Sequence, residues 1–155
     1  MQKLALATSL AFFFAASTQG AATERKYMTP PKTDARPQAP FSTGVLVGDT
    51  LYVAGHIGLD AATGQAAADV ENESRLVMDA VNKTVEQAGL AMDDLVSVTV
   101  YCTDLDLYDK FNGVYRTYFR AQYPARAFIG INKLVRGARF EVAGIAVKPA
   151  RVRKP

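Results

Sequence analysis

Hydrophobic and polar positions alternate in several short stretches of the chain, and each such stretch predicts a β-strand. Residues 41–57 contain two apolar runs separated by the pair Gly48-Asp49, which predicts a hairpin closed by a two-residue turn. Residues 95–102 alternate and are rich in β-branched side chains, so a strand is expected there as well. Further strands are expected over residues 126–131 and 140–147.

Two stretches have the spacing of helices instead. Between residues 70 and 88 apolar side chains recur every three or four positions, and Gly89 provides a C-terminal stop. In the second stretch Asp106 is the expected cap, and a stripe of aromatic side chains follows at helical spacing. We interpret this stripe as core, and it consists of Tyr108, Phe111, Tyr115, Tyr118 and Phe119.

The predicted order β-β-α-β-α-β-β indicates an α+β fold, with both helices packed on one face of a single sheet. Apolar residues occupy both faces of residues 128–131 and 140–145, so the sheet face without helices should not contact water. We therefore expect a homo-oligomer in which these faces are covered, which allows a site between subunits.

The N-terminus has the layout of a secretory signal peptide, which we assign to residues 1–22. The start is positively charged, residues 4–16 are almost entirely apolar, and the following six are small or polar. Cleavage is expected after Ala22, with Ser17 and Gly20 as alternatives. The apolar run is shorter than the ~20 residues that span a bilayer, so we expect a periplasmic or secreted protein that leaves the membrane after cleavage. An uncleaved anchor is the alternative.

Composition divides the remainder of the chain into three parts. Residues 23–39 are proline-rich and lack periodicity, which predicts an extended lead-in. Residues 40–148 suit one domain with its own core, and residues 149–155 form a basic tail. The net charge is +3, and basic residues outside the tail are interleaved with acidic ones, so no nucleic-acid partner is expected.

The chain has one cysteine and one histidine. A single cysteine excludes an intrachain disulfide, and we expect Cys102 to be buried at the end of its strand. A zinc site of thiolate and imidazole ligands is excluded by the same counts, so no metal is expected.

Arg126 follows Pro124 at the point where a helix ends and an apolar strand begins. Arginine is rarely buried without a partner, and its planar fork fits a carboxylate or a phosphate. Arg126 is therefore a candidate anchor for an anionic ligand. A surface ion pair is the alternative, because structural ion pairs are common.

Short motifs follow one another along residues 39–147. They are Ala39-Pro40-Phe41-Ser42, Tyr52-Val53-Ala54-Gly55-His56-Ile57, residues 60–64, Gly89-Leu90, Val98-Thr99-Val100-Tyr101, Phe111-Asn112-Gly113-Val114-Tyr115, Pro124-Ala125-Arg126, and Glu141 followed by Gly144-Ile145-Ala146-Val147. Each motif alone is weak evidence. Together, in this order and spacing, they resemble the RidA/YjgF family of reactive intermediate deaminases, also called the L-PSP endoribonuclease family.

The resemblance implies a chorismate-mutase-like fold that forms a homotrimer with three clefts between subunits. It implies hydrolysis of 2-imino and 2-enamino acids to 2-keto acids and ammonia, without a metal or an organic cofactor. Arg126 matches the arginine that holds the substrate carboxylate, and Glu141 matches the glutamate that handles water. Asn112 and Gly55 match residues beside the ligand.

Three positions depart from the family pattern, and the resemblance places all of them at the pocket. Phe41 stands where a tyrosine hydroxyl is usual, and Phe128 stands where a cysteine is frequent. His56 replaces the glutamine of a Ser-Gly-Gln motif. The two phenylalanines are candidate pocket walls and His56 is a candidate polar contact, with plain packing and a satisfied strand-end histidine as the structural alternatives.

Three functions remain open from the sequence. The leading hypothesis is an exported deaminase that acts through Arg126, Glu141 and water. The second is a non-catalytic trimer that binds a small carboxylate ligand. In that case Glu141 forms an ion pair or lies on a solvent-exposed face, and Asn112 forms hydrogen bonds within its own helix. The third is an endoribonuclease, for which a single histidine cannot supply a paired acid and base.

Overall fold

The computed structural model describes residues 23–29 and 39–150. The predicted signal peptide over residues 1–22 lies outside the described residues, as do residues 30–38 and residues 151–155 of the predicted tail. Among the described helices, none is long and apolar enough to cross a bilayer.

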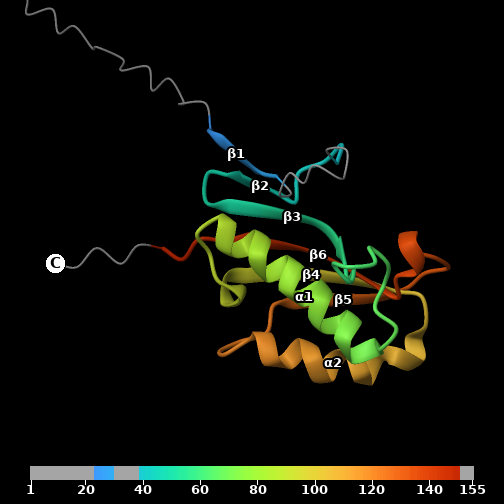
Figure 1. The fold of residues 1–155 in the computed structure, drawn as a ribbon. Coiled ribbons are helices and arrows are strands. Elements are labelled where there is room, and N and C mark those ends of the chain that lie inside the picture. Colours follow the sequence, from blue (N-terminus) through green and yellow to red (C-terminus); the bar gives the residue numbers. More distant parts are fainter. Residues whose placement is uncertain (1–22, 30–38, 151–155) are drawn as a thin grey trace, which may run out of the picture.

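One mixed sheet of six strands forms the centre of the fold (Figure 1). Its order is β1-β2-β3-β6-β4-β5; β4 and β5 run parallel, and the other neighbours are antiparallel. The strands are β1 Arg25–Met28, β2 Gly44–Val47, β3 Thr50–Ile57, β4 Leu95–Cys102, β5 Ala125–Gly130 and β6 Phe140–Val147. The helices α1 Val70–Gln87 and α2 Tyr108–Tyr115 both pack on one face of this sheet, as predicted.

The hairpin predicted at Gly48-Asp49 is formed by β2 and β3. Val47 pairs with Thr50 across the turn, and Gly48 has a φ of +59°, in the left-handed region that glycine adopts readily. Farther along, the pairing of β3 with β6 shifts register between Val53 and His56. Such a bulge re-aims side chains, and here it leaves His56 on the helix side of the sheet.

The helix α1 begins and ends where the sequence pattern predicts. The carboxylate of Asp69 accepts a hydrogen bond from the backbone N–H of Asn72 at 2.8 Å and so caps the first turn. Beyond the last helical residue Gly89 takes a φ of +78°, which ends the helix. The buried side of α1 packs on β3 and β6.

The second helix differs from its predicted form at both ends. The carboxylate of Asp104, not that of Asp106, is the cap: it accepts from the Asp106 N–H at 3.0 Å and begins the 3-10 turn Leu105–Leu107. The helix α2 follows directly and is continued by another 3-10 turn, Arg116–Tyr118. Spacings of three and four residues fit a 3-10 turn as well as an α-helix, so the aromatic stripe did not reveal the change.

The strand β1 was not predicted, because the lead-in shows no alternation. Arg25 pairs with Val47 and Met28 pairs with Gly44, which adds an edge strand to the hairpin. Met28 is only 3% exposed and belongs to the hydrophobic core. Part of the lead-in is therefore a member of the folded domain.

The two faces of the sheet have different surroundings. The helix side is the hydrophobic core, and its fully buried side chains include Leu51, Val77, Val100, Phe111 and Phe140. None of the described helices lies on the opposite face, where Tyr52, Ile129 and Val147 are exposed. Exposed apolar surface of this kind is typical of a contact face.

A buried ion pair joins α1 to the start of β6. Glu73 is 0% exposed, and its Oε1 accepts hydrogen bonds from the backbone N–H groups of Arg139 at 2.6 Å and Phe140 at 3.2 Å. Its Oε2 accepts from Arg139 Nε at 2.5 Å. The remaining nitrogens of the Arg139 guanidinium donate to the carbonyls of Ala67 and Ala68. This network anchors the strand that carries Glu141.

Candidate functional site

Arg126 is the second residue of β5, where it pairs with Val98 and directs its side chain to the helix side of the sheet. Its guanidinium carbon lies 4.5 Å from the ring centroid of Tyr115 and 5.7 Å from the centroids of Tyr108 and Phe128. Three aromatic rings therefore surround the charge. Such rings stabilise a cation, but they leave its hydrogen-bond donors unused.

The guanidinium N–H groups of Arg126 have few hydrogen-bond acceptors among the described residues. Nη2 donates to Tyr108 Oη over 3.4 Å, and Nη1 is buried with no hydrogen-bond partner among the described residues. The ion pairs among the described residues do not include Arg126. They are Glu71–Arg75, Glu73–Arg139 and Asp49–Lys148. A buried guanidinium nitrogen without an acceptor is costly, so an anion is expected to complete it.

Tyr115 lies beneath the Arg126 guanidinium. Burial raises the pKa of Tyr115 to about 12, although the charge of Arg126 acts in the opposite direction. The hydroxyl is therefore protonated at neutral pH. Like Arg126 Nη1, it is buried and finds no partner among the residues described.

Phe128 lies close to this arginine, and Asn112 belongs to the helix whose aromatic rings pack against Phe128. Asn112 is on α2 and 5% exposed, directly after Phe111, whose ring centroid is 5.7 Å from that of Phe128. Phe128 follows Arg126 on the same face of β5. We call Arg126, Asn112 and Phe128 the arginine half-site.

Glu141 lies on the other face of the sheet. Tyr101 pairs with both Glu141 and Ile129, so Glu141 shares a face with Ile129, whereas Arg126 shares the opposite face with Phe128. The carboxylate of Glu141 extends over Gly55, where an added Cβ would collide with Glu141 Oε1. Glycine at position 55 leaves room for this side chain in its present position.

Phe41 lies near the same end of β3. It comes shortly before β2, and the backbone pairing of β2 with β3 extends to Thr43, whose carbonyl accepts from the Ala54 N–H at 2.9 Å. This brings the segment with Phe41 alongside the end of β3 that carries Gly55. Phe41 is 58% exposed. We call Glu141, Gly55 and Phe41 the glutamate half-site.

A single chain does not bring the two half-sites together, because the sheet separates Arg126 from Glu141. The family resemblance placed both residues in one cleft between subunits. The structure forms each half-site but puts the two on different faces of the sheet.

His56 belongs to neither half-site in this chain. Its Nε2 lies 3.1 Å from Thr84 Oγ1 of α1, on the helix side of the sheet. Burial lowers the pKa of His56, and a backbone hydrogen bond with Thr43 offsets part of this effect. The ring is neutral at pH 7 and links β3 to α1, which is the contact expected of the structural alternative.

Tyr108 and Tyr115 contact Arg126, yet their stripe was interpreted as core alone. Tyr115 is buried as that interpretation predicts, but Tyr108 is 43% exposed. The available signal was chemical: a tyrosine in an apolar stripe carries a hydroxyl that needs a partner.

Cys102 is buried, as predicted. Its Sγ donates to the Asp104 carbonyl at 3.0 Å, and burial raises the pKa of its thiol.

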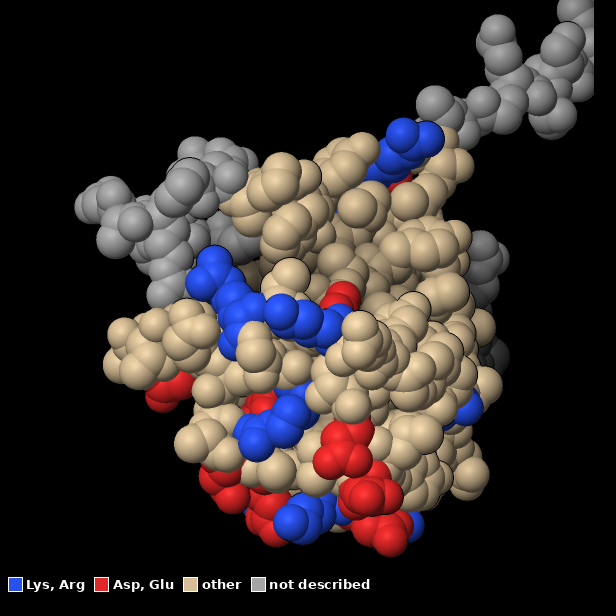
Figure 2. Space-filling model, turned by 90° about the vertical axis from the view of Figure 1, so that its right-hand side faces the viewer, with Lys and Arg blue, Asp and Glu red and all other residues tan. Residues whose placement is uncertain are grey.

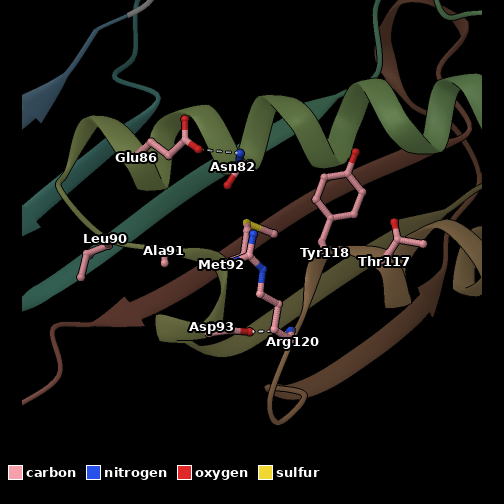
Figure 3. A pocket seen from close by; sticks show the side chains of 9 residues that line it. All are labelled: Asn82, Glu86, Leu90, Ala91, Met92, Asp93, Thr117, Tyr118 and Arg120. Atoms are coloured by element: carbon pink, nitrogen blue, oxygen red, sulfur yellow. Dashed lines mark hydrogen bonds between the residues drawn. The ribbon is translucent and has the colours of Figure 1, made fainter.

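One hollow on the described surface lies elsewhere and contains none of the predicted residues. It has a volume of about 330 Å³ and lies between α1, the loop after it and the turn after α2 (Figure 3). Several of its polar side chains already have partners: Asn82 donates to Glu86 at 3.0 Å, and Asp93 accepts from the backbone N–H of Arg120 at 3.0 Å. We interpret it as a solvated hollow.

Charges of both signs lie on the face shown in Figure 2, where basic groups form a short row with acidic groups beside and below it. Within the described residues no group of three His, Cys, Asp or Glu side chains is arranged to hold a metal ion.

Comparison with protein-family models gives a match to the family described as endoribonuclease L-PSP over residues 32–148. The chain belongs to this family. It is the RidA/YjgF family that the sequence motifs resemble, and the match covers both half-sites.

Similar proteins carry deaminase names. TdcF of Escherichia coli K12, named as a reactive intermediate deaminase, is 33% identical over 114 residues, covering 72% of this chain and 88% of TdcF. A 2-iminobutanoate/2-iminopropanoate deaminase of Bos taurus is 34% identical over 110 residues, covering 70% of this chain and 80% of that protein. The crystal structure of Escherichia coli TdcF with bound serine matches with a TM-score of 0.71 at 30% identity, covering 80% and 100% of the two chains. The predicted fold is thus confirmed.

Proposed function

We propose that this protein is an exported deaminase that hydrolyses 2-imino and 2-enamino acids to 2-keto acids and ammonia. The reaction takes place in a cleft between subunits of a homotrimer. Arg126 holds the substrate carboxylate, and Glu141 handles the attacking water. The protein's own side chains supply this chemistry, and the proposal includes neither a metal nor an organic cofactor.

The proposal is carried by the surroundings of the Arg126 guanidinium. Aromatic rings surround it, and no carboxylate among the described residues forms an ion pair with it. A 2-imino acid carries the missing carboxylate directly beside its C=N carbon. A guanidinium that grips the carboxylate therefore also fixes the position of the reacting carbon.

The chemical step needs one water and one base. The water oxygen attacks the C=N carbon while a carboxylate takes one water proton and returns it to the imine nitrogen, which gives a carbinolamine. The hydroxyl proton of the carbinolamine then passes to the nitrogen as the C–N bond breaks. The nitrogen leaves as ammonia, and the carbon becomes the ketone of a 2-keto acid. Glu141 is the carboxylate we assign to the water, because Gly55 leaves the space above its backbone open for that side chain.

Assembly follows from the separation of the half-sites. Because the sheet of one chain lies between Arg126 and Glu141, a substrate that contacts both must lie between two chains. The exposed apolar residues Tyr52 and Ile129 on the face without helices support association through that face. TdcF and the Bos taurus relative support the reaction class by name, and the serine bound to TdcF is itself a carboxylate ligand.

Export is proposed from residues 1–22 alone, which have the signal-peptide layout. Cell fractionation followed by mass spectrometry of the mature protein tests it. A periplasmic or secreted form whose new N-terminus follows Ala22, or the alternative positions Ser17 and Gly20, supports export. A full-length cytoplasmic protein contradicts it.

The competing function is carboxylate binding without turnover. The same separation of Arg126 from Glu141 favours it, because an assembly that does not bring Glu141 to a neighbour's Arg126 still binds an anion. Binding and turnover must therefore be measured separately.

The test is to generate 2-iminobutanoate in solution with an amino-acid oxidase and to follow the release of ammonia and 2-oxobutanoate. We expect the protein to accelerate release over buffer, Arg126→Ala to abolish the acceleration, and Glu141→Gln to reduce it strongly. Arg120→Ala, in the hollow of Figure 3, is the matched arginine control and should retain activity. Carboxylate binding without acceleration by the intact protein would establish the competing function, and a monomer in light scattering would overturn the intersubunit site.

A further inference from the structure

The ring of Tyr108 closes one side of the space around Arg126. Its centroid is 4.9 Å from that of Phe128, edge-on at an interplanar angle of 81°, and 5.7 Å from the Arg126 guanidinium carbon. Edge-to-face packing holds the ring in place at the first residue of α2. The residue is nevertheless 43% exposed, and the contact of its hydroxyl with Arg126 lies at the surface.

The hydroxyl of Tyr108 has unused hydrogen-bonding capacity. Its oxygen accepts from Arg126 Nη2 at 3.4 Å, which is long for an N–H···O hydrogen bond. A phenol also has one proton to donate, and the contact with Arg126 does not use it. A ligand oxygen next to Nη2 can therefore accept from the guanidinium and from the phenol together.

We propose that Tyr108 is a second donor for the ligand carboxylate, so that the anchor is an arginine–tyrosine pair. This inference rests on the proposed carboxylate site at Arg126. The guanidinium binds the carboxylate, and the Tyr108 hydroxyl turns from its long contact with Nη2 to donate to one carboxylate oxygen. This bond forms to the bound ligand and persists through the reaction, so it increases affinity without accelerating the chemical step.

Tyr108 is better placed for this role than the other aromatic residues near Arg126. The hydroxyl of Tyr115 is buried, and Phe128 has none. Phe41, which belongs to the glutamate half-site, also lacks a hydroxyl. Among the described residues in contact with the Arg126 guanidinium, Tyr108 alone combines a hydroxyl with an exposed position.

The test compares Tyr108→Phe with the unmodified protein, because phenylalanine retains the ring that packs on Phe128 and removes the hydroxyl. Calorimetric titration with 2-oxobutanoate should give a dissociation constant about tenfold higher for the variant, the size expected for one hydrogen bond to a charged group. Titration with the uncharged amide of 2-oxobutanoate should show little difference between the two proteins. A structural defect would weaken both ligands alike.

Tyr27→Phe is the matched control, since Tyr27 is an exposed tyrosine on β1 at the opposite edge of the sheet. It should bind 2-oxobutanoate as the unmodified protein does. In the imine assay Tyr108→Phe should raise KM and leave kcat nearly unchanged.

The outcomes separate this inference from the proposed function. Equal affinity of Tyr108→Phe and the unmodified protein for 2-oxobutanoate would overturn the role of Tyr108, even if imine hydrolysis is observed. Weakened carboxylate binding by the variant, in a protein that does not hydrolyse imines, would support the anchor and refute the deaminase. No binding of 2-oxobutanoate by the unmodified protein, together with no acceleration of imine hydrolysis, would refute both.

Discussion

Two arginines, one on β5 and one just before β6, have very different surroundings in this protein. Arg139 precedes β6, and its guanidinium is matched by the buried carboxylate of Glu73 and by the carbonyls of Ala67 and Ala68. Arg126 is on β5, and its guanidinium contacts aromatic rings, with Nη1 buried and unpartnered among the described residues. Arg139 therefore stabilises the fold, whereas Arg126 has hydrogen-bond donors that a ligand can use.

The difference between the two arginines shows that one charge contributes to stability and the other to ligand binding. A charge whose donors are matched contributes to holding α1 against β6, and removing its partner leaves buried groups without hydrogen bonds. A charge surrounded by rings has no such partner to lose, so its removal affects ligand binding more than folding. Substitutions on both sides test this contrast.

The largest effect is expected from Glu73→Ala. The change leaves the Arg139 guanidinium and two backbone N–H groups without their acceptor, so the free energy of unfolding should fall by roughly 3–5 kcal/mol. Urea denaturation measures this. The control is Glu71→Ala on the same helix, an exposed partner of Arg75 at 3.8 Å, which should cost less than about 0.5 kcal/mol. Similar losses for the two variants would contradict the structural role of Glu73.

The opposite behaviour is expected of Arg126→Ala. Its unfolding free energy should change by about 1 kcal/mol or less, the scale of the cation–π contacts it loses. Carboxylate binding, measured by calorimetry with 2-oxobutanoate, should weaken at least about a hundredfold, because a bidentate charged anchor is removed. A loss of stability as large as that of Glu73→Ala, with binding retained, would reverse the comparison.

A smaller effect is expected at the glutamate half-site from Gly55→Ala. The added Cβ would collide with Glu141 Oε1, so the carboxylate has to move. We expect kcat to fall about tenfold, as for a misplaced catalytic group, while 2-oxobutanoate binding changes little. Gly113→Ala serves as the stability control, since nothing lies within 4 Å of its added Cβ, and an exposed helical site should gain about 0.5–1 kcal/mol. Unchanged kcat in Gly55→Ala would argue against the position assigned to Glu141.

The smallest effect is expected from His56. Burial lowers the pKa of His56 in the folded protein below its ordinary value of 6.5, so below pH 6.5 the unfolded chain binds a proton that the folded chain does not. Stability should therefore fall modestly as the pH drops from 6.5 toward the folded pKa. Urea titrations at several pH values measure the slope, and His56→Gln should flatten it. An unchanged slope in that variant would assign the pH dependence to other groups.

Much of the fold could be predicted because its signals are local. The hairpin at Gly48 depends on a two-residue turn, the end of α1 depends on Gly89, and the span of β4 depends on alternation within eight residues. The cap was predicted at Asp106, but Asp104 caps the 3-10 turn that leads into α2. Both carboxylates stand close enough to begin a helical turn, and only the backbone conformation decides between them.

The site could be predicted residue by residue but not in its arrangement. The motif around Arg126 and the position of Glu141 identified the candidate groups, and the family match supports the motifs that named them. Which face of the sheet each group occupies depends on strand pairing, and the bulge before His56 changes the face of everything beyond it in β3.

By itself, the sequence determined the strand and helix pattern, the family and the presence of a candidate anion anchor, because caps, turns and short motifs are written in neighbouring residues. The tertiary structure alone decided that Arg139 finds a buried carboxylate 66 positions away while Arg126 finds none among the described residues. It also decided that the sheet separates Arg126 from Glu141 and that β1 joins the hairpin. The physical reason is that partners of charges and neighbours of strands are set by contacts between distant parts of the chain, which no local pattern encodes.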